Sequence, residues 1–405
     1  TVRHRGKPAE TTTGSASRLI MSVVVTTLCR LVLNTARRFA YPFAPALSRG
    51  LGVPLTAITS LIAINQATAV LGLFFGPIAD RLGYRLMMLS GMTMLVAGMF
   101  AAGLFPFYGV LLVALFLAGL GKSIFDPALQ AYVSERVPFH RRGLAIGFLE
   151  FSWAGSTLLG IPLIALLIDR LGWRAPFFTM GGLGILGILA LRIIIEKGRR
   201  HPAPGQSSPL FKGAWRHLMQ ERAALGALSF AFWISVANDN LFVVYGAWLE
   251  KQFNLSIVAL GLGTSVIGVA ELAGESLTAA LADRLGLKRS VIGGMAACLI
   301  CYGILPYLGQ TLGMALTGLF IIFLTFEFTI VTSLSLFTEL IPTSRATMMA
   351  SYLASAGVGR VVGALIGGPI WLAGGIYATA LVSAAISAVA LISLVWGLRG
   401  WHKPN

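Results

Sequence analysis

The stretch Ala79-Asp80-Arg81-Leu82-Gly83-Tyr84-Arg85 is spelled a second time, with small changes, as Ala282-Asp283-Arg284-Leu285-Gly286-Leu287-Lys288. A second set of residues returns at nearly the same offset: Glu135, Pro138 and Arg141 match Glu339, Pro342 and Arg345. In both cases about half of the 405-residue chain separates the copies. We therefore expect two copies of one structural unit, and doubled membrane folds of this kind usually place a substrate site between the copies.

The composition is that of a membrane protein. The chain is 56% hydrophobic and 11% charged, with a mean hydropathy of +0.82, whereas soluble domains carry about 25% charged residues. Apolar runs extend from about Leu19 to Leu398, which at about 20 residues per crossing is enough for roughly twelve helices. The alternating pattern of an outer-membrane barrel is absent. We therefore predict an all-α polytopic membrane protein with two pseudo-symmetric six-helix bundles.

The apolar pattern also predicts the domain limits. We expect a cytoplasmic N-terminal tail over 1–18, a first bundle over 19–196, a central cytoplasmic loop with a short amphipathic helix over 197–222, a second bundle over 223–398 and a cytoplasmic tail over 399–405. The expected helices are 19–48, 54–79, 86–105, 107–134, 142–169, 173–196, 223–250, 256–282, 288–308, 311–337, 344–373 and 375–398.

The net charge of +16 reflects topology rather than nucleic-acid binding. Most Lys and Arg lie at the termini, in the central loop or in connections on the same side, and the opposite loops hold only Arg49, Arg170, Arg174 and Lys251. By the positive-inside rule, both termini are expected in the cytoplasm of a cell (inner) membrane protein. Anionic lipid headgroups are the expected partners of the basic loops.

Nothing in the sequence points to an enzyme. All five histidines lie in expected loops or tails, and the three cysteines lie in apolar helices without a second metal-ligand pair, which favours helix packing over metal binding. No nucleotide-binding loop is present, so we expect no ATP hydrolysis, no cofactor and no metal. A monomer is the expected state.

The string from Gly76 to Arg85 resembles the signature loop between helices two and three of the major facilitator superfamily. Arg141 and Arg142, and the stretch Asp169–Arg174, resemble the drug:proton antiporter branch, although Leu115 stands where that branch often has an Arg. The resemblance implies a conformational latch in which Asp80 and Asp283 meet helix starts in the opposite bundle. The implied latch residues are Gly76, Asp80, Arg81, Gly83, Arg85, Arg141, Arg142, Asp283, Arg284, Gly286 and Arg345.

Ionisable residues at membrane depth are the main functional signal, since each costs about 2.5–3.5 kcal/mol on insertion scales. The first half contains Arg30, Arg37, Arg38, Lys122, Asp126 and Glu150, and the second contains Asp239, Glu271, Glu275, Glu327 and Arg360. A cavity with one basic and one acidic wall would suit an amphiphilic or zwitterionic substrate. Lys122 and Asp126, at i and i+4, are expected to pair along one helix.

Several carboxylates near one midplane with a single arginine cannot all stay ionised. We therefore predict proton coupling through Glu327 or Asp239, with Glu271, Arg360, Asp126 and Glu150 as the remaining members of the coupling group. Glu271 with Arg360 and Arg30 with Asp126 are alternatively interpreted as two fixed structural ion pairs that take no part in proton coupling.

Candidate substrate contacts are polar and aromatic residues on the same helices. They are Asn34, Arg37, Lys122, Trp153, Asn238, Asn240, Tyr245 and Phe326. Gly359, Gly363 and Gly367 recur every fourth residue and mark a close helix contact, which fits either sliding helices or static packing.

The leading functional hypothesis is alternating-access secondary transport, with proton-coupled export of a small amphiphilic or drug-like compound. The first alternative is a proton symporter or uniporter that takes up an anionic or zwitterionic nutrient or a lipid-like substrate, with Arg37, Lys122 and Arg360 binding the anion. A non-transporting sensor or lipid-binding scaffold on the same fold is the second alternative.

Overall fold

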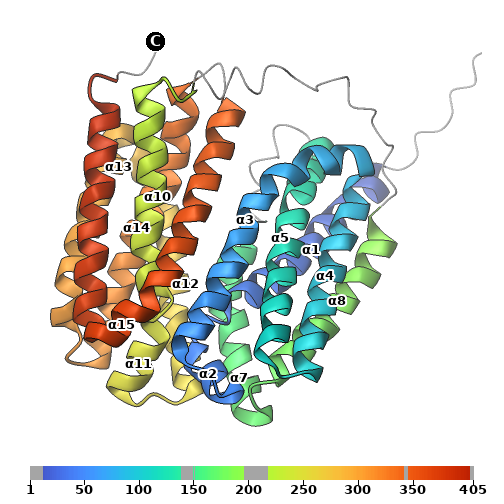
Figure 1. Ribbon diagram of the computed structural model, residues 1–405. Helices are drawn as coiled ribbons and strands as arrows, with labels where there is room; N and C mark the ends of the chain where they lie inside the picture. The colour runs from blue at the N-terminus through green and yellow to red at the C-terminus, as the bar shows by residue number, and fades with distance from the viewer. Residues whose placement is uncertain (1–11, 138–148, 150, 196–217, 342–344, 402–405) are drawn as a thin grey trace, which may run out of the picture.

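The computed structural model describes residues 12–137, 149, 151–195, 218–341 and 345–401. All regular structure within these ranges is helical, and it forms two bundles that stand side by side (Figure 1). The first bundle consists of α1 (Thr12–Arg38), α2 (Ala44–Leu51), α3 (Leu55–Leu82), α4 (Tyr84–Leu104), α5 (Tyr108–Arg136), the π-helical turn η1 (Ser156–Gly160), α7 (Ile161–Leu171) and α8 (Ala175–Ile194). The second consists of α10 (Arg222–Phe242), α11 (Tyr245–Phe253), α12 (Ile257–Leu285), α13 (Leu287–Ile304), the 3-10 turn η2 (Leu305–Leu308), α14 (Leu312–Leu340) and α15 (Arg345–Leu398).

The described helices are long and apolar enough for a multi-pass membrane protein. Eleven segments qualify as membrane spans by length and composition, and the last of them, Thr347–Leu398, is 52 residues long. This segment is bent at Gly374 and Gly375, where Gly375 has a φ of 59°. Glycine tolerates this backbone region because it has no Cβ. The break divides α15 into two crossings, which gives the twelve that the composition predicts.

The repeated string forms the same turn in both bundles. Gly83 ends α3 with φ 93° and ψ 139°, and Gly286 ends α12 with φ 84° and ψ 130°. In each case the next helix begins at the following residue, Tyr84 or Leu287. A positive φ at both sites explains why glycine occupies the same place in each copy.

The structure corrects the expected first helix of each half. The predicted helix over 19–48 is two helices, because α1 ends at Arg38 and α2 starts at Ala44. Pro42 lies in the break, and a proline also stands at the start of α2, where its fixed φ and missing N–H are tolerated. The predicted helix over 223–250 is likewise divided into α10 and α11.

The two breaks meet and join the bundles at one end of the molecule. A Cβ on Gly246 would overlap the Pro42 carbonyl oxygen, so the backbones are in close contact there. Nearby, Arg49 of α2 and Glu250 of α11 form an ion pair with an N–O distance of 2.6 Å. Figure 1 shows α2 and α11 at this end, whereas the bundles diverge toward the end that holds the C-terminus.

Candidate functional site

A cavity of about 640 Å³ lies between the bundles. Tyr41 and Phe242 line it near the joined end, and Gln130 and Leu334 line it toward the C-terminal ends of α5 and α14. Its wall contains the described ionisable residues that the sequence places at membrane depth. They belong to α1, α5, α10, α12, α14 and the part of α15 before its break at Gly374. The residues are Arg30, Arg37, Arg38, Lys122, Asp126, Asp239, Glu271, Glu275, Glu327 and Arg360.

The wall formed by the first bundle is basic and partly neutralised. Asp126 of α5 accepts a hydrogen bond from Arg30 Nε at 3.3 Å and is also paired with Lys122. The predicted i, i+4 pair between Lys122 and Asp126 is therefore confirmed. Arg30 additionally donates to the Leu149 carbonyl oxygen at 3.0 Å. The Asp126 carboxylate thus pairs with two cations, and its bond to Arg30 holds α1 against α5.

A buried ion pair links the two walls. Arg38 of α1 donates to Glu271 of α12 through Nη2 at 2.5 Å and through Nη1 at 3.2 Å. Both side chains are only 5% exposed. Glu271 therefore pairs with Arg38 across the bundle interface and not with Arg360. The sequence indicated that these helices line a cavity, but it did not indicate which arginine faces Glu271.

A chain of hydrogen bonds crosses the interface beside this pair. Arg37 donates to the Gln66 side-chain oxygen, the Gln66 amide donates to the Tyr41 hydroxyl, and that hydroxyl donates to Asp239 Oδ1 at 3.0 Å. Sequence reasoning missed Gln66 as a site residue, although a glutamine in the apolar segment 55–72 was a usable signal. Through this series of hydrogen bonds, side chains of the first bundle hold the Asp239 carboxylate of the second bundle.

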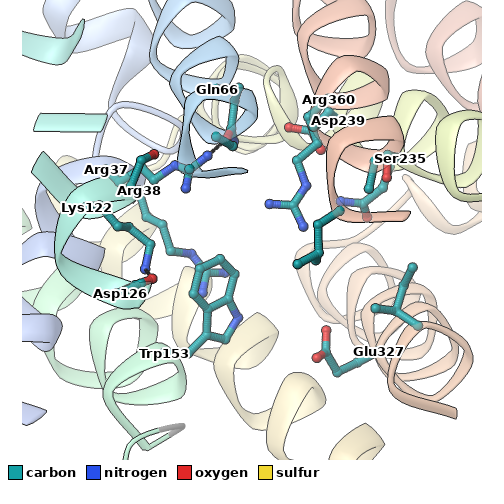
Figure 2. A pocket seen from close by; sticks show the side chains of 18 of the residues that line it. Arg37, Arg38, Gln66, Lys122, Asp126, Trp153, Ser235, Asp239, Glu327 and Arg360 are labelled. Carbon is teal, nitrogen blue, oxygen red and sulfur yellow. Dashed lines mark hydrogen bonds and ion pairs between the residues drawn. The ribbon is translucent and has the colours of Figure 1, made fainter. Parts of the chain in front are cut away.

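Three charged groups in the cavity keep unused bonding capacity. Among the described residues, Glu327 and Arg360 form no ion pair or hydrogen bond, and Arg37 Nε has no hydrogen-bond partner. Figure 2 shows Arg37 and Arg360 directed into the cavity from opposite walls, with Glu327 on the same side as Arg360. These groups are free to meet a substrate or a proton.

An aromatic surface accompanies the charges. The Arg38 guanidinium lies 4.3 Å from the centre of the Trp153 ring, and the Lys122 ammonium lies 5.9 Å from it. These are cation–π distances. Phe326 also lines the cavity. The surface is therefore able to contact an apolar group next to polar ones.

Other predicted substrate contacts have different positions. Asn238 lines the cavity, whereas Asn34 donates to Ser152 Oγ at 3.2 Å within the first bundle. Asn240 donates to the Thr379 carbonyl oxygen and to Ser383 Oγ, each at 3.0 Å, and the Tyr245 hydroxyl contacts Thr264 Oγ1 at 3.1 Å. Asn34, Asn240 and Tyr245 are thus engaged inside their own bundles, and Glu150 lies outside the described residues.

The turn between α3 and α4, which contains the predicted latch residues Gly83 and Arg85, lies at the end where the bundles diverge (Figure 1). Arg85 donates to the Arg192 carbonyl oxygen at 2.5 Å, which is a contact within the first bundle. Arg284 and Gly286 are exposed. Arg141 and Arg142 lie outside the described residues, as do the side chains of Asp80, Arg81, Asp283 and Arg345 and the surroundings of Gly76.

Comparison with known proteins gives the family. The sequence model of the Major Facilitator Superfamily matches residues 26–343 and 228–404. The chain is 24% identical over 300 residues to the uncharacterized MFS-type transporter YceJ of Bacillus subtilis, covering 74% of this chain and 76% of that protein. It is 27% identical over 234 residues to the multidrug resistance protein MdtG of Serratia proteamaculans (56% and 55% covered), and 23% identical over 271 residues to the probable L-galactonate transporter of Escherichia coli (61% and 56% covered).

A solved structure shares the fold. The crystal structure of a mutant of the nucleoside transporter NupG superposes with a TM-score of 0.80 at 12% sequence identity, covering 94% of this chain and 100% of that one. A doubled twelve-crossing architecture, a charged cavity between the halves and a family match over most of the sequence agree with one another. The chain belongs to the Major Facilitator Superfamily and is a membrane transporter, not an enzyme.

Proposed function

We propose that this transporter exports a small amphiphilic compound in exchange for protons. The observation that carries the proposal is Glu327, a carboxylate in the cavity wall that has no cation partner among the described residues. A carboxylate held in an ion pair must lose that pair to accept a proton, whereas an unpaired one at membrane depth gains by doing so. Similarity to the multidrug resistance protein MdtG supports export.

Asp239 is the second proton-coupling residue in this proposal. Its carboxylate is held by the Tyr41 hydroxyl of the opposite bundle, so a change in its protonation alters a contact that must break when the bundles separate. The two carboxylates thus divide the work: Glu327 exchanges the proton, and Asp239 links protonation to bundle movement.

The orientation follows from the charge distribution. We place the protein in the cell (inner) membrane as a monomer, with both termini in the cytoplasm and anionic headgroups at its basic loops. The cavity then opens toward the cytoplasm, and the α2–α11 contact closes the outer side. In this state a compound enters from the cytoplasm or the inner leaflet.

Substrate-driven proton movement tests this proposal. Liposomes are loaded with a pH-sensitive dye, and gradients of anionic and of cationic amphiphilic compounds are applied in turn. A gradient of a transported compound is expected to drive protons through the wild-type protein. Glu327→Gln and Asp239→Asn are expected to abolish this proton flux, because neither side chain then binds a transferable proton.

The matched control is Glu221→Gln, which alters an exposed carboxylate before α10 and outside the cavity. It is expected to retain wild-type flux. Full coupling in both Glu327→Gln and Asp239→Asn would contradict the assignment of the proton-coupling residues.

Uptake of an anionic or zwitterionic compound is the second candidate. It is favoured by the basic wall of the first bundle, where the described cavity residues include four cations, Arg30, Arg37, Arg38 and Lys122, and one carboxylate, Asp126. Similarity to a probable L-galactonate transporter fits this alternative. The direction of proton flux decides between the two, because a symporter moves protons with its substrate and an antiporter moves them against it.

A further inference from the structure

Two arginines face each other across the cavity, and neither forms an ion pair among the described residues. Arg37 comes from α1 in the first bundle and Arg360 from α15 in the second. Figure 2 shows both guanidinium groups directed into the space between the walls. Arg37 is 7% exposed, and its Nε lacks a hydrogen-bond partner among the described residues. A buried guanidinium edge without an acceptor is costly unless an acceptor binds there.

The remaining charges of the cavity do not neutralise this pair. Asp126 is shared by Arg30 and Lys122, and Glu271 is held by Arg38. Asp239 is close enough to attract both Arg37 and Arg360, but its Oδ1 accepts the Tyr41 hydroxyl. Glu275 and Glu327 also line the cavity, and Glu327 is the group that takes up the proton in the proposed function. While Glu327 is protonated, Arg37 and Arg360 together carry more positive charge than Asp239 balances.

We propose that Arg37 and Arg360 form a binding site for an anionic group of the transported compound, such as a carboxylate, sulfonate or phosphate. The guanidinium fork matches such oxyanions in a bidentate manner. This proposal rests on the proposed function in one respect, that the substrate binds in the cavity. It narrows the substrate class to amphiphiles with an anionic headgroup. Trp153 and Phe326 are in the same cavity to contact the apolar part.

The location of the site also gives the anion a mechanical role. Because one arginine belongs to each bundle, a bound oxyanion bridges the bundles and replaces a like-charge repulsion with two attractive contacts. Binding therefore favours closure of the bundles around the substrate. From the sequence alone, Lys122 is expected to bind the anion together with these arginines. Lys122 contributes less to anion binding, because it is already paired with Asp126.

Ligand binding in neutral-lipid nanodiscs tests the site without requiring transport. The probes are 4-methylphenylacetate, p-toluenesulfonate and phenyl phosphate, with 4-methylphenylacetamide as the matched neutral compound and 4-methylbenzylamine as the matched cation. Affinity is read from the concentration dependence of the thermal-unfolding midpoint. At least one anion is expected to bind roughly 10-fold or more tightly than the amide, in line with hydrogen bonds to charged groups.

Arg360→Gln, at a partly exposed side chain, is expected to weaken binding of that anion roughly 10- to 100-fold while leaving amide binding unchanged. Arg37→Gln is expected to have the same effect, and Arg360→Lys to retain part of the affinity. The control is Arg170→Gln, whose side chain is 80% exposed and lies outside the cavity.

The proposal is overturned if none of the three anions binds more tightly than the amide, or if Arg360→Gln binds them as the wild type does. The anion could also come from a lipid headgroup, and replacing part of the neutral lipid with phosphatidylglycerol tests this source. If phosphatidylglycerol weakens probe binding to the wild type but not to Arg360→Gln, the lipid headgroup binds at the same site. Full proton coupling in the Glu327→Gln and Asp239→Asn liposomes would contradict the proposed function but would leave these binding results intact, so the two proposals are tested separately.

Discussion

Glu271→Gln is expected to destabilise the protein by about 3–5 kcal/mol, which is the cost of leaving the buried Arg38 guanidinium without its counter-charge. The pair is 5% exposed on both sides, with an N–O distance of 2.5 Å, so solvent does not screen it. Thermal and denaturant unfolding of the purified protein, followed by circular dichroism, measures the loss.

The matched control is a second ion pair that joins the bundles within the described part of the chain. Arg49 and Glu250 meet at 2.6 Å, but their side chains are 58% and 25% exposed, and surface pairs contribute about 0–1 kcal/mol. Glu250→Gln is therefore expected to change stability by less than about 1 kcal/mol. Equal effects of Glu271→Gln and Glu250→Gln would contradict the argument from burial.

A double variant separates the ion pair from simple packing. Arg38→Met combined with Glu271→Gln removes both charges and is expected to recover much of the loss, because no buried charge then lacks a partner. The comparison uses the single variants Glu271→Gln and Arg38→Met. If the double variant loses more stability than these two variants lose in sum, the side chains contribute through packing and not through their charges.

Gly363→Ala is expected to destabilise the second bundle by about 1–3 kcal/mol, the usual cost of overpacking. A Cβ at this position would lie 2.6 Å from the Val236 carbonyl oxygen and 2.9 Å from the Asp239 Cβ. Both belong to α10, so α15 has to move away from it. Unfolding temperature measures the loss, and the same displacement is expected to reduce proton flux because Asp239 shifts with its helix.

Gly293→Ala is the control for this substitution. Gly293 lies in α13, and a Cβ there would have nothing within 4 Å. Alanine at a helix interior is favoured over glycine by about 0.8–1.0 kcal/mol, so this variant is expected to be as stable as the wild type or more so. A Gly363→Ala protein that unfolds at the same temperature as Gly293→Ala would show that α15 repacks without strain.

The structure also shows which helix the glycine repeat contacts. Gly359, Gly363 and Gly367 all face α10, and a Cβ on any of them would overlap a backbone oxygen of that helix. Since α10 and α15 belong to the same bundle, the glycine repeat packs α15 closely against a helix of its own bundle.

The sequence alone determined the features that depend on local geometry and on the bilayer. Apolar segments of spanning length predict the crossings, since unpaired backbone groups are excluded from lipid. The repeated string predicts equivalent segments in the two halves, and Gly83 and Gly286 do adopt the same positive φ. Lys122 and Asp126 pair as predicted, since residues four apart share a helix face.

Only the tertiary structure decided which charges meet across the cavity. Arg38 and Glu271 are far apart in the chain, and so are Tyr41 and Asp239. Their depth along a helix can be estimated from a rise of about 1.5 Å per residue, but their direction depends on how each helix is rotated in its bundle and how the bundles dock. That docking is fixed by long-range contacts such as Gly246 against Pro42, and helix periodicity carries no information about it.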